Sequence, residues 1–365
     1  MVSVDVPPPS STLRLRPGTP VLDRGGGEVQ LGTDERWALV LAGLADHEAS
    51  WLHEAASRRH ATLPGTAARH RVPDDRRDQI VRQLADCGFL VPTPRTRAEV
   101  LATAGGGADA PAVGALRPDG AGTVTLARRV LRTVALSGLG RIGAATAAHL
   151  ATAGVGTVLL DDDTPVQVTD LGAGTYEETD VGHRRSHRLQ DLFARRYPRT
   201  RVGLTWREET PPDVVVKICD RVARPETFAR LMSTGVAHLP VVVGEADVVL
   251  GPFVLPGRTA CVSCRHRHAV DADDRWPRLV GQLARWPGPA SQETVLAATT
   301  AALAAGQVLA HLDGVRPAAA NALLEVRLPD TLPRVLPTGP HPGCGCTAAA
   351  PPSSRRSRAD VPPGT

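Results

Sequence analysis

The chain has 365 residues, with 42 basic and 38 acidic side chains and a formal net charge of +4. This length suits one large domain and a small one, and so mild a charge excludes a protein that holds nucleic acid mainly by electrostatics. Aromatic residues make up only 3% of the chain, which excludes a base-stacking platform. We recognise no signal segment and no apolar run of about 18 residues, so we expect a soluble, cytoplasmic protein without membrane contact.

Both ends of the chain are rich in Pro and Ser and show no apolar period. We therefore expect residues 1–10 and the tail, residues 347–365, to be disordered. Residues 11–93 predict a small α+β domain. Residues 94–127 are dominated by Gly, Ala and Pro and predict a mobile linker.

The small domain is predicted to hold one hairpin and three helices. Apolar segments flank a turn at residues 23–27, which indicates the hairpin. Helices are predicted to begin after Asp34 and to occupy residues 47–59 and 73–87, and a short strand follows Gly88. This pattern resembles a winged-helix module. It looks like the leader-recognition element of many ribosomal-peptide-modifying proteins, which is similar to the pyrroloquinoline-quinone chaperone family. A structural or dimerising appendage is the alternative.

Residues 128–346 predict the main domain, a Rossmann-like, mostly parallel α/β sheet with helices on both faces. Apolar strands alternate with helical segments over its first half. Only three residues separate the last two predicted strands, which should therefore turn antiparallel at an edge. An Ala-rich helix that packs on the sheet is predicted over residues 292–312. The strands are predicted at residues 133–137, 157–160, 201–205, 214–219, 239–243 and 247–250.

The run at residues 134–155, VALSGLGRIGAATAAHLATAGV, is the most informative segment. An apolar strand passes through Gly138, Gly140 and Gly143 into a helix, and a second strand ends on Asp161. The glycines let the backbone approach a phosphate at the helix N-terminus, and the acid can hold a ribose. The run therefore predicts a nucleotide site, although dehydrogenases and methyltransferases share such a turn.

Four of the six cysteines form two close pairs, Cys261-x-x-Cys264 and Cys344-x-Cys346. In a cytosolic chain such pairs indicate metal rather than disulfides, and together they can hold one tetrahedral Zn²⁺. A site closed by four thiolates has no open position for water and would be structural. Four free buried cysteines are the alternative. Three histidines could replace one thiolate, namely His266, His268 and His341.

Taken in order, these motifs resemble the ThiF/MoeB/HesA family of adenylyltransferases that activate ubiquitin-like proteins. The resemblance covers residues 128–346: the glycine turn, a segment from Asp180 to Arg185, the strand VVVKICD ending on Asp220, and both cysteine pairs. It implies binding of ATP·Mg²⁺ and transfer of AMP to a C-terminal carboxylate, with release of pyrophosphate. A nicotinamide oxidoreductase, the third candidate, leaves the cysteine pairs and the Asp220 strand unexplained.

The resemblance implies a cofactor site at the first two strands. Asp161 matches the acid that holds the ribose, and Asp163 lies in the same acidic segment. Three glycines match the family's turn, namely Gly138, Gly140 and Gly143.

The remaining matches concern the phosphates. Asp220 matches the acid that holds Mg²⁺, and Arg185 takes the place of a phosphate-gripping Lys; we expect both to be catalytic. The family's triphosphate-gripping Arg is replaced here by Gly172 or Ala173, and the loss of such a cation puts catalysis in question. Arg141, inside the glycine turn, could supply the missing charge or block the phosphate.

A covalent thioester on this protein is not expected. Family members that form one carry a cysteine after the first metal pair, and the chain has none between Cys264 and Cys344. Cys87 and Cys219 are predicted to be small core residues. Residues 269–291 are predicted to form a crossover segment, which in related folds lies near the substrate. A surface loop without a role in binding is the alternative.

Two functions follow. The first is an ATP-dependent adenylyltransferase for a peptide or ubiquitin-like protein, with ATP, Mg²⁺ and structural Zn²⁺. The second is an adenylation-deficient protein that binds a ribosomal-peptide leader for a separate cyclodehydratase in azoline-peptide biosynthesis. Asp161, Asp220 and Arg185 favour the first, whereas the absent Arg and the front domain favour the second. Because the family usually works as a homodimer, we expect a homodimer here.

Overall fold

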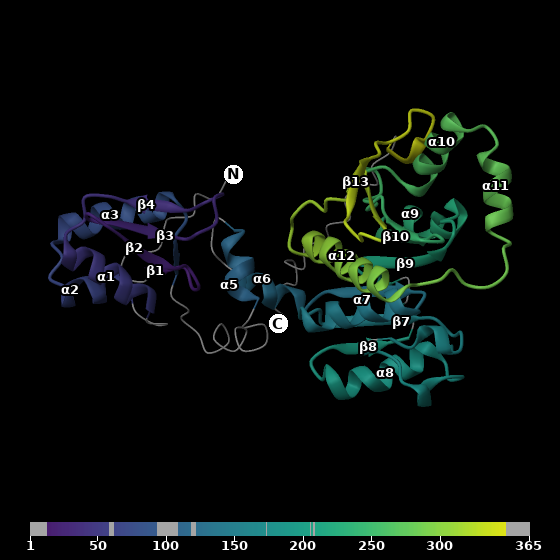
Figure 1. Cartoon of the computed structure of the whole chain (residues 1–365), viewed down its shortest axis with the longest axis horizontal. Helices are drawn as coiled ribbons and strands as arrows, with labels where there is room; N and C mark the ends of the chain where they lie inside the picture. Colours follow the sequence, from purple (N-terminus) through teal and green to yellow (C-terminus); the bar gives the residue numbers. More distant parts are fainter. Residues whose placement is uncertain are drawn as a thin grey trace, which may run out of the picture. The chain divides into compact units, whose positions relative to one another are not determined.

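The computed structural model describes residues 13–57, 62–92, 109–117, 122–172, 174–204, 206 and 209–347. The chain divides into two compact units, residues 1–128 and residues 129–365 (Figure 1). The tail predicted to be disordered, residues 347–365, lies outside the described residues except for Thr347, as do residues 1–10 and most of the predicted linker.

The first unit contains two small antiparallel sheets. The hairpin predicted at residues 23–27 is confirmed as the turn between β2 and β3, and the short strand after Gly88 is confirmed as β5, which pairs with β1. The strands are β1 (Leu13–Leu15), β2 (Val21–Gly25), β3 (Glu28–Leu31), β4 (Leu39–Leu41) and β5 (Leu90–Pro92).

Three helices share the core of this unit: α1 (Asp46–Ser57), α2 (Leu63–Arg69) and α3 (Asp74–Asp86). α1 and α3 confirm the helices predicted at residues 47–59 and 73–87. The indole N–H of buried Trp51 donates to the Leu63 carbonyl at 3.1 Å, which ties α1 to α2. α2 was not predicted, because a helix of seven residues with Pro and Gly in its first turn has no clear apolar period.

The helix predicted to begin after Asp34 is wrong. Asp34 starts only a turn, in which the Ala38 N–H donates to the Asp34 carbonyl at 2.8 Å, and the chain then forms β4. The apolar spacing of this stretch fits a helix and a strand equally well. Pairing with β3, which sets Leu39 opposite Leu31, decides for the strand.

Two short helices lie in the predicted linker, α5 (Ala110–Ala115) and α6 (Gly122–Arg129). α5 packs on the first unit, since a Cβ at Gly18 would lie 2.7 Å from the side chain of Pro111. The described part of this segment is therefore helical, in contrast to the mobile linker that its composition predicts.

The second unit is built on an eight-stranded sheet in the order β13-β12-β11-β10-β9-β6-β7-β8. β8, β7, β6, β9 and β10 run parallel, and β11 to β13 are antiparallel. The strands are β6 (Thr133–Ser137), β7 (Thr157–Asp161), β8 (Arg201–Gly203), β9 (Val214–Asp220), β10 (Ala237–Val243), β11 (Asp247–Leu250), β12 (Ala322–Arg327) and β13 (Arg334–Pro337).

The six predicted strands are all present, and the antiparallel turn between β10 and β11 is confirmed. This pair does not lie at an edge, because β12 and β13 continue the sheet. Neither of those strands was predicted, since their alternation of apolar and polar residues is short and lies beyond the long helix. The described residues between β8 and β9 hold no helix, so strands and helices do not alternate throughout.

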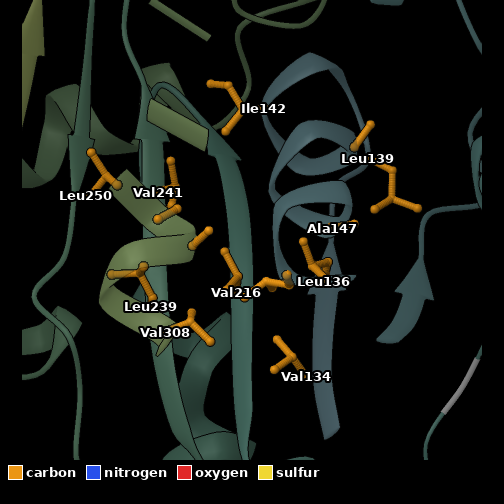
Figure 2. Packing of buried hydrophobic residues seen from close by; sticks show 14 of the residues in the cluster. Val134, Leu136, Leu139, Ile142, Ala147, Val216, Leu239, Val241, Leu250 and Val308 are labelled. Atoms are coloured by element: carbon orange, nitrogen blue, oxygen red, sulfur yellow. The ribbon is translucent and has the colours of Figure 1, made fainter. Parts of the chain in front are cut away.

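Helices cover both faces of the sheet, as predicted. α7 (Arg141–Thr152), α8 (Arg185–Arg196) and α12 (Thr294–Leu312) share one core with the strands. Figure 2 shows Ala147 of α7 and Val308 of α12 in this core, together with residues of the central strands. The short helix α9 (Ala229–Ser233) and α10 (Val262–Ala272) pack on the other face. α11 (Trp276–Leu283) buries none of its residues.

α12 confirms the helix predicted over residues 292–312. It is long and apolar enough to span a membrane by length and composition. In this fold Ala304, Ala305 and Val308 are buried in the core that α12 shares with α7 and the sheet. The core helix of a globular domain has this composition, and its small side chains permit close packing.

The glycine turn leads to the first prediction. A Cβ at Gly143, in the first turn of α7, would lie 1.9 Å from the Gly138 carbonyl oxygen. This is a backbone atom, so it can move only if the whole turn moves with it. We expect Gly143→Ala to destabilise the second unit by at least about 2 kcal/mol, as overpacking does. Calorimetric unfolding measures the loss.

Gly306, on an exposed position of α12, is the matched control. A Cβ there would meet nothing within 4 Å, so Gly306→Ala should stabilise the helix by about 0.5–1 kcal/mol. Equal melting temperatures for the two variants would contradict the packing argument.

Candidate functional site

A cavity of about 410 Å³ lies at the carboxyl ends of β6 and β9. The chain runs from β6 outwards through β7 and β8 and then returns to β9 on the other side, so the strand order reverses between β6 and β9. Open α/β sheets bind their ligands in this crevice. The cavity is lined by Gly138, Gly140, Arg141, Asp170, Arg185, Asp220 and residues 289–293, among others.

The glycine turn forms one wall of the cavity. Gly138 has a φ of +86°, and a Cβ there would lie 3.1 Å from the side chain of Ile218 on β9. Gly140 directly precedes α7. The first amide groups of the helix therefore lie at the cavity wall, an arrangement that attracts anions.

The acid that touches this turn is Asp162. Its Oδ2 accepts a hydrogen bond from the Leu139 N–H at 2.6 Å, and its side chain is 7% exposed. Asp161 is the last residue of β7, and the preceding Leu160 points into the core that holds α7 and α12. Because side chains alternate along a strand, the Asp161 side chain lies on the opposite face, where it is exposed. Asp163 has a side chain 78% exposed, 3.8 Å from Arg184. None of these three acids lines the cavity, whereas the sequence predicts that Asp161 and Asp163 bind the cofactor there.

Arg185 is held by two carboxylates. Its guanidinium lies 2.6 Å from Asp170 and 3.1 Å from Asp162, and it also donates to the Thr164 hydroxyl at 2.9 Å. Burial alone would raise the pKa of Asp162, but the hydrogen bonds from Thr164 and Leu139 and the charge of Arg185 outweigh it, and the pKa is held below its usual value. The positive charge of Arg185 is therefore compensated within the protein.

Asp220 ends β9 at the opposite wall. Its Oδ1 accepts a hydrogen bond from the Ala290 N–H at 3.0 Å. The next residue, Arg221, has a φ of +61° and donates to the Gly288 carbonyl at 2.8 Å. The segment that precedes α12 is thus anchored beside the predicted Mg²⁺ ligand.

Arg141 reaches across the cavity from the start of α7. A Cβ at Gly172 would lie 3.7 Å from Cγ and Nε of Arg141. The Arg141 side chain therefore lies beside one of the two positions at which the resemblance locates the absent triphosphate Arg; the other, Ala173, lies outside the described residues. Its Nη1 donates to the Thr294 hydroxyl at 3.2 Å, whereas its buried Nε has no partner among the described residues.

The two cysteine pairs meet in space, away from this cavity. Sγ of Cys261 lies 3.8 Å from that of Cys264 and 3.8 Å from that of Cys344, and the Cys264 and Cys346 sulfurs are 3.3 Å apart. Tetrahedral zinc with Zn–S bonds of about 2.3 Å places its sulfurs about 3.8 Å apart. The four thiols therefore fit one Zn²⁺ without help from a histidine.

The two lone cysteines differ from each other. Cys219 is half-buried, and burial raises the pKa of its thiol to about 11, which suppresses the nucleophilic thiolate. Cys87 is exposed at the end of α3, so its predicted place in a core is wrong.

The structure brings together most of the predicted nucleotide-site residues. Five of them line the cavity, namely Gly138, Gly140, Arg141, Arg185 and Asp220. Gly143 lies behind the turn, where it leaves room for the Gly138 carbonyl. Asp162, Asp170 and Gln292 were not predicted from the sequence. The adjacent acids of the DDD run could have pointed to Asp162, but nothing in the sequence marks Gln292.

The family model described as the ThiF family matches residues 125–346 of this chain. No curated protein matches it. Among solved structures, the chain is similar in fold to E. coli MccB with ATP, at 16% identity over 92% of this chain and 99% of that one, with a TM-score of 0.65.

Two further solved structures have the same fold. E. coli MccB with AMPCPP and selenomethionine MccA is 16% identical over 93% of this chain and 100% of that one, with a TM-score of 0.68. PaaA is 14% identical over 88% of this chain and 98% of that one, with a TM-score of 0.66.

The Asp162 contacts lead to a pH prediction. Because the folded-state pKa of Asp162 is depressed, its stabilising effect is present above the unfolded pKa of about 4 and is lost as the pH falls through the folded value. Asp162→Asn should cost about 1–3 kcal/mol of unfolding free energy at pH 7, and less as the pH falls below about 4.

Urea unfolding at several pH values measures this effect. Asp163→Asn is the matched control, since the exposed Asp163 carboxylate should leave stability unchanged at every pH. A cost for Asp162→Asn that stays constant down to pH 3 would contradict the assignment.

Proposed function

Because the chain belongs to the ThiF family, we propose that it is an ATP-dependent adenylyltransferase that activates the carboxylate of a peptide. The observation that carries the proposal is the shared cavity, in which the glycine turn, Arg141 and Asp220 face one another. A carboxylate oxygen would attack the α-phosphorus of ATP. The bond to the β-phosphate would break, and pyrophosphate would leave together with Mg²⁺.

Each wall of the cavity has a role in this proposal. The amide groups at the start of α7 cradle phosphate oxygens, and Asp220 binds Mg²⁺, which suits one carboxylate combined with phosphate oxygens. Asp162 fixes the glycine turn through Leu139. The Asp162 oxygens are already bonded to Leu139, Thr164 and Arg185, so we assign Asp162 this positioning role and not the ribose.

Arg141 takes over the task of the absent Arg. It lies beside Gly172, and its Nε has no partner in the part of the chain that the structure describes. A cation at this place stabilises the charge that develops on the phosphates as the α–β bond breaks, and such cations commonly contribute several orders of magnitude in rate. Arg185 is paired with Asp170 and Asp162, so its part is to position those acids and the phosphate edge of the cavity.

A peptide is the proposed source of the carboxylate. The MccB structures of similar fold hold the peptide MccA, and the first unit of this chain resembles a leader-recognition element. We therefore assign recruitment of the peptide to residues 11–93 and activation to residues 128–346, in a homodimer in the cytoplasm. Residues 94–127 connect the two.

A second function is favoured by a specific observation. The Arg185 charge is already compensated by two carboxylates, and the chain has Gly172 or Ala173 where the family has an Arg. A protein with these features could bind a leader peptide for a separate cyclodehydratase without adenylating it. Binding of ATP distinguishes the two functions.

We assign a structural Zn²⁺ to Cys261, Cys264, Cys344 and Cys346, whose sulfur separations fit a tetrahedral thiolate site. Four thiolates close the coordination sphere, so the ion would hold α10 to the segment after β13 and take no part in the chemistry.

Calorimetry with ATP·Mg²⁺ tests the enzyme. We expect wild-type protein to bind in the micromolar-to-millimolar range and Asp220→Ala to bind at least about tenfold more weakly, because the metal loses its carboxylate. Asp161→Ala is the matched control and should bind like wild type. Folded wild-type protein that binds no ATP would exclude adenylation and leave the peptide-binding function.

Metal analysis tests the zinc site. Purified protein should contain about one equivalent of zinc, and replacing all four clustered cysteines by Ser should remove it and lower the melting temperature. Cys87→Ser, at an exposed position outside the cluster, should change neither quantity. Metal-free wild-type protein with an unchanged melting temperature would contradict the assignment.

A further inference from the structure

One side chain of the chain itself fills the phosphate end of the cavity. The Oε1 atom of Gln292 accepts a hydrogen bond from the Ile142 N–H at 2.9 Å, in the first turn of α7. Its Nε2 lies 2.9 Å from the place that a Cβ at Gly140 would take. The carboxamide therefore offers an oxygen to a helix N-terminal amide, which is what a phosphate oxygen would do.

The segment that carries Gln292 is fastened to the cavity on both sides. We call residues 288–293 the strap. Three residues near the glycine turn and the end of β9 form hydrogen bonds with the strap, namely Arg141, Asp220 and Arg221. Ala290 N–H donates to Asp220 at 3.0 Å, Arg221 donates to the carbonyls of Gly288 at 2.8 Å and Pro289 at 3.3 Å, and Arg141 donates to the Gln292 carbonyl at 3.1 Å.

We propose that the strap is a gate of the nucleotide site, in which the Gln292 carboxamide occupies the place of a phosphate oxygen and leaves when nucleotide binds. This inference rests on the function proposed above. The Ile142 N–H cannot serve both acceptors in the same place. A charged phosphate forms a stronger hydrogen bond than a neutral amide oxygen, so a phosphorylated ligand displaces Gln292 and a nucleoside does not.

Opening of the strap couples phosphate binding at the glycine turn to Mg²⁺ binding at Asp220. Phosphate at the glycine turn removes the Gln292 contact, and Mg²⁺ at Asp220 competes with the Ala290 N–H for the same carboxylate. ATP·Mg²⁺ therefore releases the strap at two points, whereas phosphate or metal alone releases it at one. The strap joins α11 to α12 and lines the cavity, so its release frees one wall of the nucleotide site.

The variant Gln292→Ala tests the gate. It removes the competing acceptor, so ATP·Mg²⁺ should bind more tightly than to wild type, by about tenfold for one hydrogen bond and the space it occupied. Gln292→Glu keeps the acceptor and adds a negative charge, so it should bind ATP·Mg²⁺ more weakly. Gln282→Ala, which removes the same carboxamide from exposed α11, is the matched control and should bind like wild type.

Hydrogen–deuterium exchange of full-length protein gives a second readout. The Ala290 amide should exchange slowly in free wild-type protein, and faster with ATP·Mg²⁺ or in Gln292→Ala. Adenosine should leave its exchange unchanged.

The outcomes separate the gate from the proposed function. Wild type that binds ATP, with Gln292→Ala binding equally or more weakly, overturns the gate and leaves the enzyme intact. If neither protein binds ATP, both proposals fall. Binding by Gln292→Ala alone supports both, since the carboxamide then keeps the wild-type site closed.

Discussion

The nucleotide cavity depends on how closely the glycine turn approaches the end of β9. A Cβ at Gly138 would lie 3.1 Å from the Ile218 side chain, and a Cβ at Gly143 would lie 1.9 Å from the Gly138 carbonyl oxygen. A side chain at either position would push α7 away from the sheet, and with it the amide groups that face the cavity. The Asp162 carboxylate then holds the turn through Leu139, and Arg185 holds Asp162. Most of the site therefore follows from two absent Cβ atoms.

Much of this fold is readable from the sequence, because its elements carry local signals. The glycine run, the six strands and the Ala-rich helix have clear periods and clear ends. The strand β4 and the helix α2 have no such clear period. Three residues such as Leu39-Val40-Leu41 fit the period of a helix as well as that of a strand, and only pairing with β3 makes them a strand. β12 and β13 likewise take their place from the sheet that they extend.

The site was harder to read than the fold. A strand can be located within a residue or two, but a shift of one residue moves a side chain to the other face. This is the difference between Asp161 and Asp162 at the end of β7. The missing Arg was visible in the sequence, yet the approach of Arg141 to Gly172 depends on folding. Gln292 reaches the glycine turn from a segment about 150 positions away, a contact that no local pattern encodes.

The cysteine cluster has a consequence for the chain between its two pairs. α11, the strap, α12, β12 and β13 all lie between Cys264 and Cys344. A metal ion that joins the two pairs closes this stretch into a loop, and loop closure reduces the number of conformations of the unfolded chain. Metal content would therefore affect the stability of the whole unit that carries the nucleotide cavity.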